Sequence, residues 1–396
     1  MQFAERMSRL GTESAFDVLV RARALEAQGK HVVHLEIGEP DFDTPAHIVE
    51  AGVAALRAGE THYTPAAGIP QLREAIAEYT SRTRGVELGP ERVVVTPGAK
   101  PIMFFVIQAL AGPGDEVVYP DPGFPIYESV INYSGATAVP LRLSEERAFS
   151  FAPEELAGLV SERTKLVIIN SPHNPTGGTI SGDALDELAR LANEHDFMVL
   201  SDEIYSRMLY DGVHKSIITR PGMLERTIIL DGFSKTYAMT GWRLGYGVMP
   251  LPMAEQVTRL AVNCNSCVPA FTQLAGVAAL TGPQEPAETM VAEFRRRRDA
   301  VVAGLNEIPG VSCLTPAGAF YVFPNISSFG QPASEVASRL LDEGGVALLG
   351  GTAFGAAGEG YLRLSYANSL PNLELALERI GDTLARVRDS GLGTRG

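Results

Sequence analysis

Short apolar runs recur between Arg92 and Met249, each followed by a loop and then by a helical pattern. The runs are RVVVT from Arg92, DEVVYP from Asp115, KLVIIN from Lys165, FMVLSDE from Phe197, TIILDGF from Thr227 and LGYGVM from Leu244. They are rich in Val and Ile and do not alternate with polar residues, which is typical of strands buried on both faces. The pattern predicts an α/β fold with a mostly parallel sheet sandwiched by helices.

Helical periodicity fills the intervals between these runs. In the segment GDALDELARLANEHD, one stripe collects Leu185, Leu188, Leu191 and Ala192. After about Pro286 the pattern changes to charged helical segments followed by SCLTPAGAFYVFP, GVALLGG and YLRLSYA, which favours a smaller α+β domain. We predict a large domain over residues 43–285 and a small domain over 286–396. Residues 1–42 are expected to form an arm that packs on the small domain.

Charge and composition narrow the range of partners. The chain has 396 residues, 45% hydrophobic and 20% charged, with a formal net charge of −14. This balance is typical of a globular protein and argues against a nucleic-acid or anionic-membrane surface. The run Arg295–Arg298 is the one basic cluster, and Glu293 precedes it, so we interpret it as a solvated helix face with a few ion pairs.

No membrane or secretory segment is expected. Charged residues interrupt the apolar residues near the N-terminus, and the longest uncharged stretch, 260–284, contains Asn, Pro, Gln and Gly. Cys264 and Cys267 form a C-x-x-C, but no second pair accompanies them, so we expect buried thiols and no metal site. Three cysteines suit a reducing compartment, and we expect a cytoplasmic protein.

Ligands of open parallel sheets bind at the carboxyl ends of the strands, so the residues after each run are candidate site residues. Successive runs are followed by Gly98, Ala99 and Lys100, by Phe124, by Asn174, by Asp202 and Tyr205, by Ser234 and Lys235, and by Arg243. Lys235 has no charged neighbour between Phe233 and Trp242. A lysine held among small and aromatic residues can lose its proton and act as a nucleophile.

One ligand needs all of these groups. The turn at Gly98 opens a helix, whose N-terminus suits a phosphate that Arg243 can also clamp. Phe124 offers a face for a flat ring, and Asp202 can hold a protonated ring nitrogen. Asn174 and Tyr205 can bond a ring hydroxyl, and Lys235 can form an imine with an aldehyde. These parts belong to pyridoxal 5'-phosphate.

Each residue also has a structural interpretation when it is taken alone. Asp202 could cap a helix, Phe124 could be core, NPTG after Asn174 could be a plain turn, and Arg243 could form a structural ion pair. Their joint order on successive strand ends favours the cofactor site. A dehydrogenase on a similar sheet would need a G-x-G-x-x-G after the first strand, which is missing.

The chain resembles the class I/II aminotransferases of the aspartate aminotransferase fold family, fold type I of the pyridoxal-phosphate enzymes. The resemblance runs from IGEPDFDTP at Ile37 to YLRLSYA at Tyr361. It is carried by HYTPAAGIPQLREAIA, SPHNPTGG, SDEIYSRMLYDG and FSKTYAMTGWRLGY.

The resemblance implies a role for each matching residue. Lys235 is expected to be the Schiff-base lysine, and Asp202 to bind the ring nitrogen. Asn174 and Tyr205 are expected to bond the ring oxygen, and Phe124 is expected to stack on the ring. The residues expected to surround the phosphate are Gly98, Ala99, Lys100, Ser234 and Arg243. Tyr63 in HYTP would reach the phosphate site of the partner subunit, which implies a homodimer. Arg363 would bind the substrate α-carboxylate, with Gly38 close by.

Two departures from the family pattern concern the cofactor contacts. Many relatives carry Trp or Tyr where Phe124 stands, and a hydroxyl residue in the turn that here contains Ala99 and Lys100. Ser234 could supply the missing phosphate bond. Lys100 could contact an acidic substrate side chain or only add charge near the phosphate.

The implied function is transfer of the α-amino group of an L-amino acid to a 2-oxo acid, EC 2.6.1.-, with the donor open. The alternatives are a carbon–sulfur β-lyase or an amino-acid cyclase using the same cofactor, and a regulator that has lost turnover. The last would not need Lys235, Tyr63 and Arg363 together. A transaminase would form glutamate from an amino acid plus 2-oxoglutarate, whereas a lyase would form ammonia and pyruvate without an acceptor.

Overall fold

A seven-stranded central sheet organises the computed structural model, which describes residues 1–392. Its strand order is β2-β8-β7-β6-β5-β3-β4. The strands are β2 (Val93–Thr96), β3 (Glu116–Asp121), β4 (Thr137–Arg142), β5 (Thr164–Asn170), β6 (Met198–Asp202), β7 (Thr227–Gly232) and β8 (Gly245–Val248). Only β8 runs opposite to the other six strands, so the predicted mostly parallel α/β fold is confirmed.

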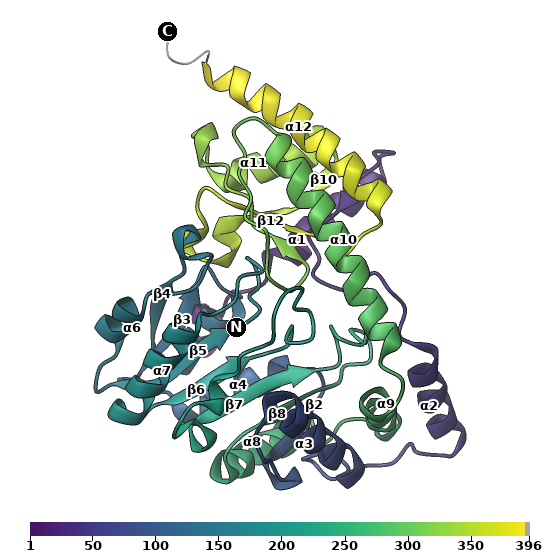
Figure 1. Cartoon of the computed structure of the whole chain (residues 1–396), viewed down its shortest axis with the longest axis vertical. Coiled ribbons are helices and arrows are strands. Elements are labelled where there is room, and N and C mark those ends of the chain that lie inside the picture. The colour runs from purple at the N-terminus through teal and green to yellow at the C-terminus, as the bar shows by residue number, and fades with distance from the viewer. Residues whose placement is uncertain (393–396) are drawn as a thin grey trace.

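Helices cover both faces of this sheet (Figure 1). Ile168 of β5 packs into one apolar cluster together with α4 (Lys100–Leu110), α5 (Ile126–Ser134) and α8 (Leu251–Cys264). The neighbouring Val167 faces the opposite side, where α6 (Pro153–Leu159) and α7 (Gly182–His195) pack. Further along that opposite side, Val93 and Val95 meet α2 (Ala46–Arg57), α3 (Pro70–Arg84) and α9 (Ala270–Thr281). Burial on both faces explains why these strands lack polar alternation.

The edge strand β4 was not predicted from the sequence. Its six residues, TAVPLR, are largely exposed or half-buried, and only Leu141 is buried. An edge strand needs no apolar residues on its solvent side, so its pattern does not stand out from a loop.

A smaller sheet lies above the first. It has the order β11-β12-β9, with β11 (Leu349–Gly350), β12 (Leu362–Ser365) and β9 (Tyr321–Val322). Helix α10 (Glu285–Glu307) runs from beside α9 up to α12 (Leu370–Leu392), while α11 (Ala333–Arg339) packs on β11 (Figure 1).

The interpretation of Arg295–Arg298 as a solvated face is wrong for half of the run. Arg295 and Arg296 are exposed on α10, but Arg297 and Arg298 are each only 6% exposed. Arg297 is held by Asp41 and Glu293, at 2.6 and 2.9 Å. Consecutive helix positions point in different directions, so a run of four must send part of its length inward.

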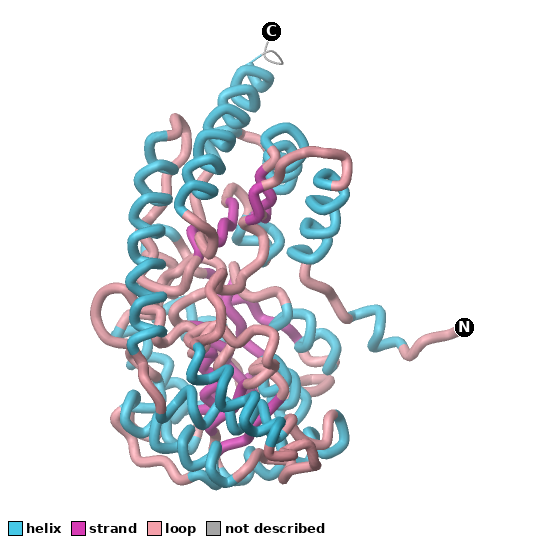
Figure 2. Tube along the Cα trace, turned by 90° about the vertical axis from the view of Figure 1, so that its right-hand side faces the viewer, coloured by secondary structure: helices cyan, strands magenta, loops and turns pink. Residues whose placement is uncertain are grey.

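The N-terminal segment contacts the smaller sheet region. Strand β1 (Val33–His34) pairs in parallel with β10 (Val346–Ala347), and Ala22 of α1 (Ser14–Glu26) packs against Leu341 and Ala347. The first residues extend away from the body of the chain (Figure 2). The division of the chain at residues 42 and 285 stays a prediction.

Candidate active site

A cavity of about 970 Å³ lies at the carboxyl ends of β5, β6 and β7. The sheet register explains why strand-end residues meet there, because Asn170 lies beside Asp202 and Asp202 beside Leu230 on parallel neighbours. Most of the residues singled out from the sequence line the cavity: Gly38, Ala99, Lys100, Phe124, Asn174, Asp202, Tyr205, Ser234, Lys235, Arg243 and Arg363.

Lys235 follows β7 and points its amine at the cavity. Its Nζ donates a hydrogen bond to the carbonyl oxygen of Gly38 at 2.5 Å and lies 5.7 Å from the centroid of the Phe320 ring. Desolvation by these surroundings is the main reason that the pKa of the amine is lowered to about 8; Glu39 opposes the shift and Arg243 adds to it. The side chain can therefore exist as a free amine near neutral pH.

Asp202 is the last residue of β6 and is buried. Tyr127 donates its hydroxyl hydrogen to Oδ2 at 2.6 Å, and the backbone N–H of Ile204 donates to Oδ1 at 3.2 Å. Burial raises the pKa of the carboxyl to about 6 although both hydrogen bonds lower it. Asp202 forms no ion pair among the described side chains, although the charge of Lys235 also lowers its pKa, so a cationic ligand at this place would stabilise the carboxylate.

A turn and a helix N-terminus form a second polar region of the cavity. Gly98 has φ +85°, and a Cβ at this position would lie 2.2 Å from Nη2 of Arg243. Ala99 precedes the first residue of α4, so the free N–H groups of that helix and the Arg243 guanidinium face the same place. Arg243 is itself oriented by donating Nη1 to the carbonyl oxygen of Thr240 at 2.7 Å. The arrangement suits a phosphate.

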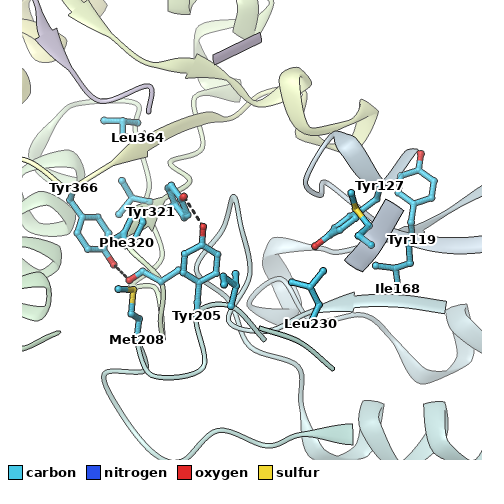
Figure 3. Packing of buried hydrophobic residues seen from close by; sticks show 14 of the residues in the cluster. Tyr119, Tyr127, Ile168, Tyr205, Met208, Leu230, Phe320, Tyr321, Leu364 and Tyr366 are labelled. Carbon is cyan, nitrogen blue, oxygen red and sulfur yellow. Dashed lines mark hydrogen bonds between the residues drawn. The ribbon is translucent and has the colours of Figure 1, made fainter. Parts of the chain in front are cut away.

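Tyr205 and Asn174 add two polar groups on the wall between these regions. The hydroxyls of Tyr205 and Tyr321 point toward each other at 2.8 Å (Figure 3), and burial raises the pKa of Tyr205 well above its usual range. The backbone N–H of Asn174 is held by the side chain of Asn170 at 2.8 Å. The amide oxygen of Asn174 is buried and has no hydrogen-bond partner among the described residues. A ligand hydroxyl would satisfy it.

Arg363 approaches from the smaller sheet, on β12. Its side chain is buried between the rings of Tyr321 and Phe354, whose centroids lie 4.8 and 5.1 Å from Cζ. Nη2 donates to the backbone carbonyl oxygen of Glu36, while Nε has no hydrogen-bond partner in residues 1–392. Burial lowers the pKa of the guanidinium from its usual value. A buried cation with a free N–H suits a ligand carboxylate.

Tyr63 is the predicted site residue that the single chain does not bring to the cavity. Its side chain is 93% exposed and does not line the cavity. Its expected contact is with the partner subunit, so the role stays a prediction. Gly98 is absent from the cavity wall itself but lies against Arg243.

The expectation of two buried thiols is wrong. Cys264, the last residue of α8, is exposed, Cys267 is half-buried, and both are free.

Sequence comparison identifies the family. A sequence model described as aminotransferase class I and II matches residues 30–380. The chain belongs to this family. An aspartate aminotransferase of Pyrococcus horikoshii is 40% identical over 96% of this chain and 97% of the relative. The arginine–pyruvate transaminase AruH of Pseudomonas aeruginosa is 40% identical over 96% of both.

Solved structures agree with the sequence match. The aspartate aminotransferase of Thermus thermophilus with maleate superposes with a TM-score of 0.92 at 39% identity, covering 97% of this chain and all of that one. The fold type I resemblance is therefore confirmed. This aminotransferase is a pyridoxal-phosphate-dependent enzyme that moves amino groups of amino acids; the strand ends predicted the cofactor, and the family resemblance predicted the reaction.

The residues present fit the cofactor. The cavity offers a buried carboxylate without a cation at Asp202, an amide oxygen without a donor at Asn174, and a helix N-terminus beside Arg243. Phe124 lines the same cavity and its ring meets that of Tyr127 edge-on, with centroids 5.6 Å apart. In residues 1–392 no cluster of His, Cys, Asp and Glu suits a metal ion, and no helix has the length and apolarity to cross a bilayer.

Sequence reasoning missed Tyr127 and Tyr321 as site residues. Tyr127 stands three positions after Phe124 on the first turn of α5, and this helical spacing is the only local signal that it shares the site. Tyr321 belongs to β9 of the smaller sheet, 116 residues from its partner Tyr205. No local pattern marks it.

Proposed function

We propose that Lys235 and Asp202 are the catalytic pair of this aminotransferase, and that Arg363 sets the orientation of the substrate. The observation that carries the proposal is the meeting of three groups in one cavity. They are an amine with a pKa of about 8, a buried carboxylate without a cation, and a buried guanidinium with a free N–H. Lys235 and Asp202 follow adjacent parallel strands, so the rigid sheet fixes their separation.

The cofactor would be held by the groups that surround the cavity. Asp202 would bind the ring nitrogen, Asn174 and Tyr205 the ring oxygen, and Phe124 would lie on the ring. The phosphate would be bound by Gly98, Ala99, Lys100, Ser234 and Arg243. When bound, pyridoxal phosphate supplies an aldehyde for the substrate amine and a protonated ring that accepts charge from the α-carbon.

The chain's own residues perform the proton transfer. Nζ of Lys235, whose pKa of about 8 leaves a minor fraction of the amine uncharged at pH 7, takes the α-proton of the amino acid and later returns a proton. Asp202 stays ionised beside a cation and so keeps the ring nitrogen protonated. Arg363 and Gly38 hold the α-carboxylate so that the α-hydrogen faces Lys235. Position 38 has no room for a larger side chain, because a Cβ at Gly38 would lie 2.1 Å from the hydroxyl oxygen of Tyr321.

We further propose a cytoplasmic homodimer in which Tyr63 completes the phosphate site of the partner subunit. Its 93% exposure in the single chain supports a role outside its own cavity. Sedimentation analysis should give a dimer, and Tyr63→Phe should weaken retention of the cofactor. A monomer that holds the cofactor normally would refute this part.

A panel of amino acids tests the proposed reaction. The aldehyde form of the bound cofactor should convert to the amine form, and added pyruvate or 2-oxoglutarate should then yield alanine or glutamate. The donor is open, because relatives of equal identity are named for aspartate and for arginine with pyruvate. Release of ammonia without an acceptor would instead indicate the carbon–sulfur lyase.

A further inference from the structure

The cavity wall carries more acidic side chains than the cofactor needs. Besides Asp202, the carboxylates that line it are Glu13, Glu26, Glu36, Glu39 and Asp41. Lys235, Arg243 and Arg363 are committed to the proposed reaction, Lys100 is assigned to the phosphate site, and the remaining basic residues on the wall are Arg23 and His34. Asp41 is paired with Arg297, and His34 contacts Glu26 and Glu36, so the acidic groups left for a substrate side chain are Glu13, Glu39 and the second oxygen of Glu36.

Lys100 is already neutralised. Its amine, which lies 5.2 Å from the centroid of the Phe124 ring, forms an ion pair with Glu13, whose side chain is 20% exposed. A second carboxylate on a substrate would have to displace Glu13 from this pair. Arg23 offers little help, because it lies ten residues further along α1, roughly 15 Å at 1.5 Å per residue, near Glu26.

Glu13 acts on the place where the substrate would sit. Its negative charge favours the protonated form of both Lys235 and Arg363, the groups expected to meet the α-amino and α-carboxylate ends. Glu39 acts on Lys235 in the same sense and is held by the hydroxyl of Thr240 at 2.9 Å. Two carboxylates therefore face the substrate position from different segments of the chain.

Glu36 provides the second, independent observation. It is fully buried on the cavity wall, and its Oε1 bonds Nδ1 of His34 at 2.7 Å. Its Oε2 has no hydrogen-bond partner among the described residues. Glu36 lies beside the substrate position, because its backbone carbonyl oxygen accepts from Arg363. A buried carboxylate oxygen without a donor is costly, and a ligand N–H would satisfy it.

We propose that the preferred amino donor has a cationic side chain, a guanidinium or ammonium on a flexible aliphatic stem, bound by Glu13 and by the free oxygen of Glu36. Donors with a second carboxylate are disfavoured, because they meet these acids and find Lys100 already paired. The inference rests on the proposed function and adds the substrate class. In this proposal Lys100 stays at the phosphate site, paired with Glu13, and does not contact an acidic substrate side chain.

Pairs of donors that are similar in size and differ in side-chain charge test the proposal. The holoenzyme is mixed with arginine or citrulline, lysine or norleucine, and glutamate or glutamine, and loss of the aldehyde form is followed at several donor concentrations. We expect arginine and lysine to exceed their neutral partners at least tenfold in kcat/KM. Glutamate should fall at least tenfold below glutamine.

Two variants assign the preference to the residues. Glu13→Gln should reduce the arginine-to-citrulline ratio at least fivefold and raise the rate with glutamate, because Lys100 is then free. Lys100→Met should keep the preference for arginine. Glu5→Gln removes an exposed acid from the same N-terminal segment, outside the cavity wall, and should change neither ratio.

The outcomes distinguish failure of the proposed substrate preference from failure of the proposed aminotransferase reaction. Citrulline and norleucine equal to their cationic partners, glutamate equal to glutamine, or an unchanged ratio in Glu13→Gln would overturn the inference while the aminotransferase reaction stands. If none of the six amino acids converts the cofactor, the proposed function fails and the inference fails with it.

Discussion

Removal of the Arg84 guanidinium should destabilise the protein, because two buried carboxylates, those of Glu203 and Asp231, would lose their cationic partner. Arg84 ends α3 and donates Nε to Glu203 at 2.6 Å and Nη2 to Asp231 at 3.2 Å. The exposed fractions of the three side chains are 3, 0 and 6%. Glu203 directly follows Asp202, so this ionic network lies immediately behind the active-site cavity.

The magnitude follows from burial. Removing one partner of a buried ion pair costs about 3–5 kcal/mol, because the other charge stays without water. Burial would raise the pKa of Glu203, but Arg84 and His214 hold it well below its usual range. Burial raises the pKa of Asp231 to about 7, so this carboxyl can take up a proton and reduce the cost. We expect Arg84→Met to lower the free energy of unfolding by about 3 kcal/mol at neutral pH.

Urea unfolding measures this difference. Protein concentration is fixed and cofactor is in excess, because both affect apparent stability. Glu203 has a lower pKa folded than unfolded, so its contribution is present above its unfolded value of 4.5 and is lost as the pH falls. In the variant the buried carboxylates take up protons more readily, so the difference between the two proteins should shrink toward acid pH.

A surface ion pair provides the matched control. Arg190 on α7 pairs with Glu187 and Glu194, and its side chain is 54% exposed. Arg190→Met should leave the unfolding transition where it is, because water replaces the lost partners. A loss below about 1 kcal/mol in Arg84→Met, or a loss that grows with acidity, would refute the argument from burial.

Three further predictions concern the cofactor site. In cofactor-free protein, labelling of Lys235 by an amine-directed reagent should rise with pH around a midpoint near 8, and a midpoint above 10 would contradict the assignment. In the cofactor-bound protein, borohydride should fix the cofactor to Lys235, and a cofactor fixed to Lys100 would contradict the assignment. Asp202→Ala should bind cofactor weakly and lose turnover by several orders of magnitude, and near-normal turnover would mean that another group supports the ring nitrogen. Gly98→Ala should raise the cofactor dissociation constant at least tenfold, because its Cβ would lie 2.2 Å from Arg243 and its φ is +85°; unchanged retention would show that the turn has room.

The sequence alone located the strand ends and with them much of the cavity wall. Strands buried on both faces must be apolar throughout, so Val- and Ile-rich runs marked them without ambiguity. Parallel strands present their carboxyl ends at one edge, and the residues after β5, β6 and β7 therefore had to meet. The proximity of Asn174, Asp202 and Lys235 therefore follows from the sequence pattern.

Other features depended on contacts between distant segments. Tyr321 meets Tyr205 from the smaller sheet, Glu13 reaches Lys100 from the N-terminal segment, and Arg84 meets Glu203 across 119 residues. No local periodicity encodes such pairs, because each side chain obeys the pattern of its own helix, strand or loop.

The burial of charged side chains was likewise only partly predictable from the sequence. The sequence indicated that Lys235 is unusual, since its neighbours carry no charge. It gave no sign that Arg297 and Arg298 are buried while Arg295 and Arg296 are exposed. A residue type states what a side chain can do, whereas its solvent and partners, which set its charge and energy, exist only once the chain has folded.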